Sequence, residues 1–84
     1  MKPNIRLRDA FFEVVDNQIK ANDPPETAET MKRLKEQGYS EFEAKQLIGQ
    51  CIALETFMVM KHGQEHNPER YIRNLNNLPE EPEE

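Results

Sequence analysis

The sequence predicts an all-α fold, a compact four-helix domain with the third helix at its centre. The longest apolar-rich segment, residues 40–62, carries apolar side chains nearly all round a helix, which is typical of a helix buried on most sides. Short stretches of helix-ending and helix-starting residues, at 22–26, 38–40 and 63–67, divide the chain into four helical segments. The alternation of apolar and polar residues that marks a half-buried strand does not occur.

Length and composition indicate one small domain. The chain has 84 residues, of which 36% are hydrophobic and 32% are charged, so it can bury only a modest core. We expect a single helical domain over residues 1–79. Residues 80–84 are four glutamates and one proline, which have nothing to bury, so we expect them to form a disordered acidic tail.

The net charge of −5 does not describe the folded part of the chain. Four of the sixteen acidic residues lie in residues 80–84, which leaves twelve acidic residues against eleven basic ones. A nearly neutral body argues against nucleic acid as a partner, because nucleic acid requires a basic face. No long uncharged apolar run and no basic leader is present, so we expect neither membrane spanning nor secretion, and we expect a cytoplasmic protein.

The first helix is expected over residues 4–21, where Asn22 and Asp23 end it. At helical spacing it presents one mostly apolar stripe, formed by Leu7, Phe11, Val14, Val15, Gln18 and Ile19. Gln18 lies in the middle of this stripe, where a buried amide side chain would need a hydrogen-bond partner.

The second helix is expected to run to about residue 37. Asp23 is predicted as its N-cap, Pro24 as its first residue and Glu26 as the residue that completes a capping box. Its apolar stripe is narrow and consists of Thr27, Met31 and Leu34.

A tight corner is predicted between the second and third helices. Gly38 should end the second helix in a left-handed conformation, and Tyr39 is placed to pack back on Leu34 in a Schellman-type contact. Ser40 should cap the third helix, with Glu43 completing a capping box. We therefore expect these two helices to form a hairpin or a steep crossing.

The third helix carries one carboxylate within its apolar surface. Its apolar arc includes Leu47, Cys51, Leu54 and Met58. Glu55 points into this arc, where an unpaired carboxylate would be costly. We therefore expect a buried polar pair, in which Gln18 and Glu55 hydrogen-bond across the interface of the first and third helices. Cys51, the single cysteine, is expected to act as a small buried hydrophobe in a reducing compartment.

The third helix should end at His62 and Gly63, and a short fourth helix should follow a polar loop. Asn67 is predicted as its N-cap and Pro68 as its first residue. Its apolar positions recur at helical spacing and are Tyr71, Leu75 and Leu78. We expect this face to cover the third helix.

No set of residues in the sequence meets the geometry of a catalytic site. Ser40 is the one serine and serves as a cap, and the glycines are isolated rather than gathered in a phosphate-binding loop. The candidate metal ligands are Glu13, Glu55, His62 and His66. Gly63 interrupts the helix between the two histidines, so we expect no metal and no cofactor, and we expect His62 to complement the helix dipole.

One set of residues spreads over most of the chain: Gln18, Asp23, Pro24, Pro25, Glu26, Arg33, Leu34, Gly38, Tyr39, Ser40, Glu43, Ala44, Ile48, Glu55, Tyr71, Leu75, Leu78 and Pro79. With its DPPE turn at residues 23–26 and its GYS corner at residues 38–40, this pattern resembles a family of small uncharacterised bacterial all-helical proteins. The resemblance implies a bacterial origin and a helical fold, and it assigns no function.

The resemblance further implies histidines at three positions that would suit a metal site. This chain has Arg8, Phe12 and Gln46 there. Of the polar set it keeps Glu13, Gln18 and Glu55. Either the family binds a metal and this member has lost the site, or these residues never served a metal. Gln46 and Glu55 lie about half a turn of angle apart on a helix, so we do not expect one site to use both.

Three short helices can hardly enclose a helix that is apolar on every side. We expect homodimerisation through Phe42, Ala53, Phe57 and Met60, and the alternative is a monomer in which the last helix covers this face. The favoured function is a non-enzymatic interaction or accessory module whose partner is a second copy or another protein. The alternative is a metal-binding or metal-dependent enzyme-like protein that uses Glu13 and Glu55 with one of the two histidines.

Overall fold

Four helices follow one another in the computed structural model, which describes residues 3–63 and 65–84, with side chains described from residue 8. They are α1 (Pro3–Ala21), α2 (Pro25–Glu36), α3 (Glu41–His62) and α4 (Pro68–Asn77). The described residues contain no strand, so the predicted all-α four-helix domain is confirmed. Leu7 lies outside the residues whose side chains are described.

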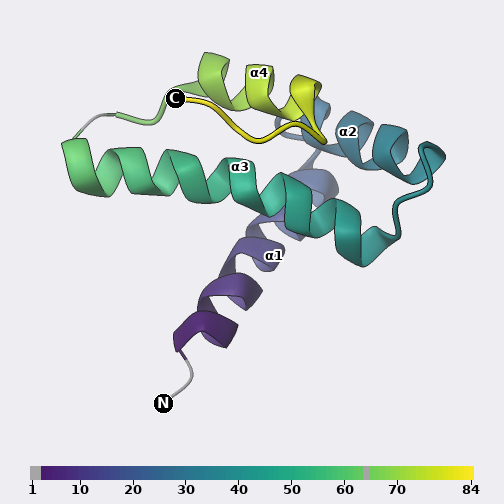
Figure 1. Ribbon diagram of the computed structural model, residues 1–84, viewed down its shortest axis with the longest axis horizontal. Helices are drawn as coiled ribbons and strands as arrows, with labels where there is room; N and C mark the ends of the chain where they lie inside the picture. The colour runs from purple at the N-terminus through teal and green to yellow at the C-terminus, as the bar shows by residue number, and fades with distance from the viewer. Residues whose placement is uncertain (1–2, 64) are drawn as a thin grey trace.

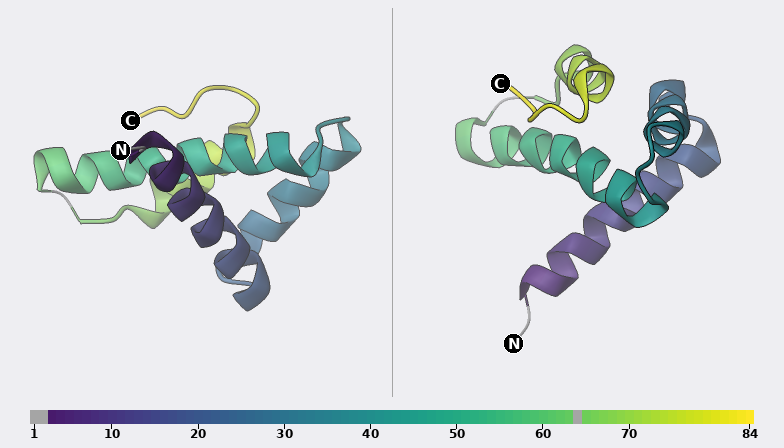
Figure 2. Two further views of the ribbon diagram at one scale, coloured as in Figure 1. Left: turned by 90° about the horizontal axis from the view of Figure 1, so that it is seen from below. Right: turned by 45° about the vertical axis from the view of Figure 1, so that its right-hand side comes forward.

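The third helix lies at the centre, as predicted, because α3 packs against each of the other three helices and supplies the largest share of the buried core, with Ala44, Ile48, Cys51 and Ile52. Figure 1 shows α3 running across the molecule, with α4 along one side of it and the first half of α1 leaving on the other. The turned views in Figure 2 show that α1 and α2 form a V that meets at their junction, and that the far end of α2 leads into the start of α3. Within the described ranges, none of the helices combines the length and apolar character needed to cross a bilayer.

The core lies where the four helices meet. Its buried members are Val15, Leu34, Ala44, Ile48, Cys51, Ile52, Tyr71, Leu75 and Leu78. Each fully buried aliphatic side chain contributes about 1.5–3 kcal/mol relative to an exposed one. The apolar positions predicted for α4, together with the lone cysteine, are all in this core.

The predicted corner between α2 and α3 is confirmed in detail. Gly38 has a φ of +104°, and the N–H of Tyr39 donates to the carbonyl of Leu34 at 3.1 Å, which completes a Schellman motif. The N–H of Glu43 donates to the Ser40 hydroxyl at 3.0 Å, and the N–H of Ser40 donates to the Glu43 carboxylate at 2.9 Å. These bonds satisfy backbone groups at both helix ends and fix the crossing of α2 and α3.

The start of α2 differs from the prediction. Pro24 is the N-cap and Pro25 the first helical residue, and no side chain caps this end. Asp23 does not cap α2 because it belongs to the end of α1. Asn22 has a φ of +54°, and the N–H of Asp23 donates to the carbonyl of Gln18 at 3.0 Å, so this pair terminates α1 with a Schellman motif of its own.

The third helix is less enclosed than its composition suggests. About 100° per residue puts Phe42 and Met60 on the side of α3 opposite the buried Ala44 and Cys51. Its exposed apolar residues are Phe42, Phe57, Val59 and Met60. The alternative that the last helix covers this side is wrong, because α4 packs on the other side of α3 (Figure 1).

Instead, α1 crosses this side of α3 at a single point. A Cβ on Gly49 would lie 3.7 Å from the Cβ of Phe11, an ordinary van der Waals distance, so the two helices touch at this residue. The Phe12 and Phe42 rings meet edge to face with centroids 5.4 Å apart. Beyond this crossing, the first half of α1 projects from the body (Figure 2).

The fourth helix is closed at both ends by side chains. The Asn67 side chain accepts the N–H of Arg70 at 3.1 Å, as the sequence predicts for this N-cap. At the other end, the Arg33 guanidinium of α2 donates to the carbonyl of Leu78 at 2.8 Å and to that of Leu75 at 2.9 Å. The carbonyl of Leu75 also accepts the N–H of Leu78 at 3.2 Å, and Leu78 is the C-cap of α4, so a residue of α2 completes the end of this helix.

The segment after α4 contacts the helix again. Asn74 accepts the N–H of Glu83 at 2.9 Å and donates to its carbonyl at 3.0 Å. Two such bonds contribute about 1 kcal/mol each, against an ordering cost of about 1 kcal/mol or more for each residue that they hold in place. The disorder expected for residues 80–84 stays a prediction, and no pattern in the sequence indicates this contact.

Arg33→Lys should lower the free energy of unfolding by about 1.5 kcal/mol, because an ammonium group cannot donate to both carbonyls with the fixed fork of a guanidinium. The measurement is the midpoint of urea unfolding followed by circular dichroism. Arg73→Lys, at an exposed position of α4, is the matched control and should leave the midpoint unchanged. An unchanged midpoint for Arg33→Lys would show that Arg33 acts through its charge alone.

Candidate functional site

Glu55 and Arg70 form a buried ion pair between α3 and α4. The Nε of Arg70 donates to Oε2 of Glu55 at 2.6 Å, and its Nη2 donates to Oε1 at 3.1 Å. The two side chains are 6% and 7% exposed. The backbone N–H of Asn67 adds a further bond to Oε1 at 3.1 Å. The carboxylate that the sequence places inside an apolar arc is therefore held by charged and neutral donors.

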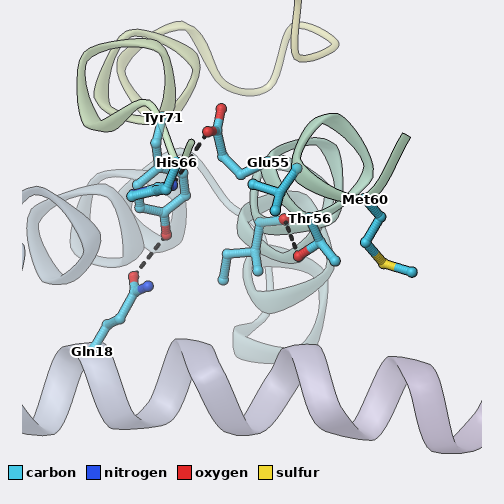
Figure 3. A pocket seen from close by; sticks show the side chains of 8 residues that line it. Gln18, Glu55, Thr56, Met60, His66 and Tyr71 are labelled. Atoms are coloured by element: carbon cyan, nitrogen blue, oxygen red, sulfur yellow. Dashed lines mark hydrogen bonds and ion pairs between the residues drawn. The ribbon is translucent and has the colours of Figure 1, made fainter. Parts of the chain in front are cut away.

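His66 lies at the edge of this pair. Its Nδ1 is 3.3 Å from Oε1 of Glu55, while its side chain is 57% exposed. Its ring stands 6.2 Å from that of Tyr71, with an angle of 57° between the planes. In Figure 3, His66 and Tyr71 stand together above one end of a pocket, with Glu55 beside them.

The pKa of Glu55 shows what this environment does. Burial alone would raise the pKa, and it is the largest influence, but the hydrogen bonds from Arg70 and from the N–H of Asn67 act against it together with the charges of Arg70 and His66. The net result is a pKa below the ordinary value of 4.5. Glu55 is thus a carboxylate at neutral pH, whereas a general base works best with a pKa near the working pH.

Gln18 is held at a separate point. Its Oε1 accepts the hydroxyl of Thr27 and the hydroxyl of Tyr71, both at 2.7 Å. Because both hydroxyl protons are used there, the 3.5 Å approach of Thr27 to Tyr71 is a contact without a proton to share. Burial raises the pKa of Tyr71 to about 12, so the phenol keeps the proton that it donates.

The predicted direct bond between Gln18 and Glu55 is therefore corrected. Each of the two side chains is satisfied by other residues, and Gln18 is only half-buried. They nevertheless face one pocket of about 280 Å³, which Figure 3 shows from close by. Its lining residues are Gln18, Ile52, Glu55, Thr56, Val59, Met60, His66 and Tyr71. The helical angles place both residues toward the same space, and their partners come from α2, from α4 and from the N-cap of α4.

Arg70 and Thr27 are the residues that sequence reasoning missed. Arg70 comes three residues after the predicted N-cap Asn67, which places it in the first turn of α4 and next to the core residue Tyr71. A basic residue in the first turn of α4, next to a core residue, is the feature of the sequence that could have identified the partner of Glu55. Thr27 was assigned to the apolar stripe of α2, where its hydroxyl was overlooked.

Cys51 is buried on the α3 face that points into the core. Burial, followed by the nearby charge of Glu55, raises the pKa of its thiol to about 12. At neutral pH about one thiol in 10⁵ would be ionised, so Cys51 is not an available nucleophile.

The candidate metal ligands are not gathered into one place. Glu55 and His66 meet, but Glu13 is exposed on α1, and His62 is exposed at the end of α3, with its ring 6.3 Å from that of Phe57. Among the described residues, no group of three or more His, Cys, Asp or Glu side chains lies close enough together to hold a metal ion.

A second groove, of about 360 Å³, lies where α1 crosses α3. Arg8, Phe12 and Gln46 line it together, and these are the positions at which the resemblance implies histidines. The Arg8 guanidinium carbon stands 5.9 Å from the centre of the Phe12 ring and 5.7 Å from that of Phe42. A cation on two aromatic faces thus occupies this groove. Glu55 lines the other pocket, so the expectation that one site would not use both Gln46 and Glu55 agrees with this geometry.

Glu55→Gln should lower the free energy of unfolding by about 3 kcal/mol at neutral pH, because it leaves Arg70 buried without its counter-charge. The folded-state pKa of Glu55 lies below the unfolded one, so its stabilisation is full above about pH 4.5 and is lost as the pH falls through the folded value. The measurement is the urea midpoint of the parent protein and of Glu55→Gln between pH 3 and pH 7, which is about the range in which carboxylates titrate. A difference that stays constant over the series would contradict it.

Comparison with known proteins adds no information about this site. No protein-family model, no curated protein and no solved structure matches this chain. The resemblance to small bacterial helical proteins therefore stays a prediction, and the function is argued from the contacts of this chain.

Proposed function

We propose that the protein is a non-enzymatic interaction module that self-associates through the exposed apolar side of α3. The observation that carries this proposal is the exposure of large apolar side chains there: Met60 is 79% exposed, Phe42 49% and Phe57 46%. The partly buried Ala53 lies between them on the same side of the helix. Isolated apolar residues are common on surfaces, whereas several on one helix face mark an interaction site.

The shape of this face supports a second copy as the partner. The crossing of α1 at Gly49 separates Phe42, which packs on Phe12, from Phe57 and Met60. The first half of α1 and the second half of α3 diverge from this crossing and leave an open angle between them (Figure 1). In a two-fold dimer, each copy would contribute the first half of its α1 and the exposed apolar side of its α3, so every apolar contact would be made twice. Burying one exposed Phe or Met side chain contributes about 1.5–3 kcal/mol.

The state of the reactive groups also supports a non-enzymatic role. The Glu55 carboxylate is engaged by Arg70 and Asn67, and burial raises the pKa of both Cys51 and Tyr71 to about 12. A nucleophile or general base is useful when it changes protonation near the working pH. These three buried groups are instead held in one protonation state.

Native mass spectrometry and light scattering at tens of micromolar protein should show a dimer without added mass. Phe57→Glu and Met60→Glu should each convert it to a monomer with an unchanged helical circular dichroism spectrum, because each would bury a carboxylate in the interface. Val14→Glu is the matched control, since Val14 is 37% exposed on α1 and lies outside the proposed face. A monomeric parent protein, or a dimer that survives both substitutions, would refute self-association through α3.

The alternative, a metal-binding protein that has lost its site, is favoured by one observation. Arg8, Phe12 and Gln46 line a single groove, so histidines at these positions would face one space. Three imidazoles with one open position are a common zinc ligand set. The present Arg8 guanidinium stacked on aromatic rings leaves no ligand of that kind in the groove.

Combining Arg8→His, Phe12→His and Gln46→His should create affinity for Zn²⁺ or Co²⁺, seen as a visible absorption band of bound cobalt and as a raised melting temperature. A triple variant in which Gln37→His replaces Gln46→His is the control, because Gln37 follows α2 and lies outside the groove. If both triple variants bind the metal equally weakly, the groove does not hold a lost metal site.

A further inference from the structure

Asn74 recognises the backbone of an extended segment. It is 1% exposed, and its side-chain amide both accepts the N–H of Glu83 at 2.9 Å and donates to the Glu83 carbonyl at 3.0 Å. An amide that pairs with the N–H and the carbonyl of one residue reproduces the bonds that a neighbouring strand would make. The Glu83 side chain itself is exposed, so Asn74 contacts the main chain rather than a particular side chain.

Charge and shape near Asn74 select the kind of segment that fits. Pro82 is half-buried, and Figure 1 shows residues 79–84 running back along α4 on the side that faces α3. The pKa of Arg70 is raised mainly by its hydrogen bond to Glu55, and the charge of Glu84 adds to this. The surface therefore holds an extended backbone and takes a half-buried proline beside it, and the segment seated there is acidic.

The segment that lies there is only weakly held. Glutamate and proline bury little apolar area, so two hydrogen bonds and a screened charge must offset the ordering of the whole segment. Prolines at 79 and 82 restrict the free chain and reduce that cost without removing it. Asn74, in contrast, is fixed on a helix that Arg33 and Asn67 close at its ends. A weakly held segment on a rigid site can be exchanged for another.

We propose that the surface of α4 around Asn74 is a docking site for an extended, proline-containing acidic segment of a partner protein, and that residues 80–84 occupy it in cis. The proposed partner segment has the same chemistry as residues 80–84, which lie on this surface in the structure. A partner segment would take over both bonds of Asn74, so the buried amide would lose nothing in the exchange. This site lies on the opposite side of α3 from the proposed self-association face, and the two proposals are independent.

The test uses a chain that ends at Pro79 and a fluorescent peptide of residues 78–84. Fluorescence anisotropy should show binding of the peptide to the shortened chain, and binding to the full chain should be weaker by about tenfold or more, because the tethered segment competes at high effective concentration. Asn74→Ala in the shortened chain should weaken binding by about tenfold. Asn76→Ala is the matched control on the exposed side of α4 and should leave binding unchanged.

A second variant covers the case in which the shortened chain does not fold. Glu83→Pro in the full chain removes the N–H that Asn74 accepts, and this variant should bind the peptide as the shortened chain does. Failure of a folded shortened chain to bind at millimolar peptide would overturn the proposal, as would equal binding after Asn74→Ala or of a peptide with lysine in place of glutamate. Self-association of the full chain that disappears on shortening would also overturn it, because the occupant would then be a second copy.

Discussion

The ion pair of Glu55 and Arg70 is the contact on which the arrangement of the helices depends. Glu55 lies 4% exposed in the core-facing side of α3, where a lone carboxylate would be too costly to keep. Arg70 neutralises it and at the same time fixes the first turn of α4 against α3. With that turn fixed, the next residue, Tyr71, reaches Gln18 of α1. The ion pair between α3 and α4 thus positions the tyrosine that joins α4 to α1.

Such a pair contributes more to the choice of structure than to net stability. Desolvating two charges costs nearly as much as their attraction returns, so an apolar pair of similar volume could be equally stable. An apolar pair would, however, allow α4 to slide or rotate on α3, because hydrophobic contact has no direction. The two-point geometry of Arg70 on Glu55, together with the N–H of Asn67, admits one register.

The sequence predicts local structure here better than contacts between helices. The Gly38 to Ser40 corner and the Asn67 cap depend on residues within one turn of each other, and both are confirmed. The need of Glu55 for a partner also follows from its helical angle. Its partner does not, because periodicity gives the direction of a side chain on its own helix and not which residue of another helix comes opposite.

The errors in the sequence prediction have the same origin. Asp23 can end one helix or begin the next, and the hydrogen bond to Gln18 decides for the first. The exposure of the apolar side of α3 agrees with the expectation that the other helices leave it uncovered, whereas the alternative in which the last helix covers it fails, because the sequence does not say on which side of α3 that helix packs. The crossing of α1 over Gly49 brings together residues that are far apart in the chain, which helical periodicity does not predict.

The bonding of Gln18 has a consequence for which substitutions the fold can accept. A single oxygen atom joins α1, α2 and α4, since Thr27 and Tyr71 both donate to it. Asparagine would be too short to reach both hydroxyls, and glutamate would carry a charge toward the carboxylate of Glu55 in the shared pocket. Thr27 and Tyr71 each give up one bond when replaced, whereas Gln18 gives up both. The largest loss of hydrogen bonds therefore falls on the residue that is most open to solvent, whereas replacing Tyr71 also removes a side chain from the core.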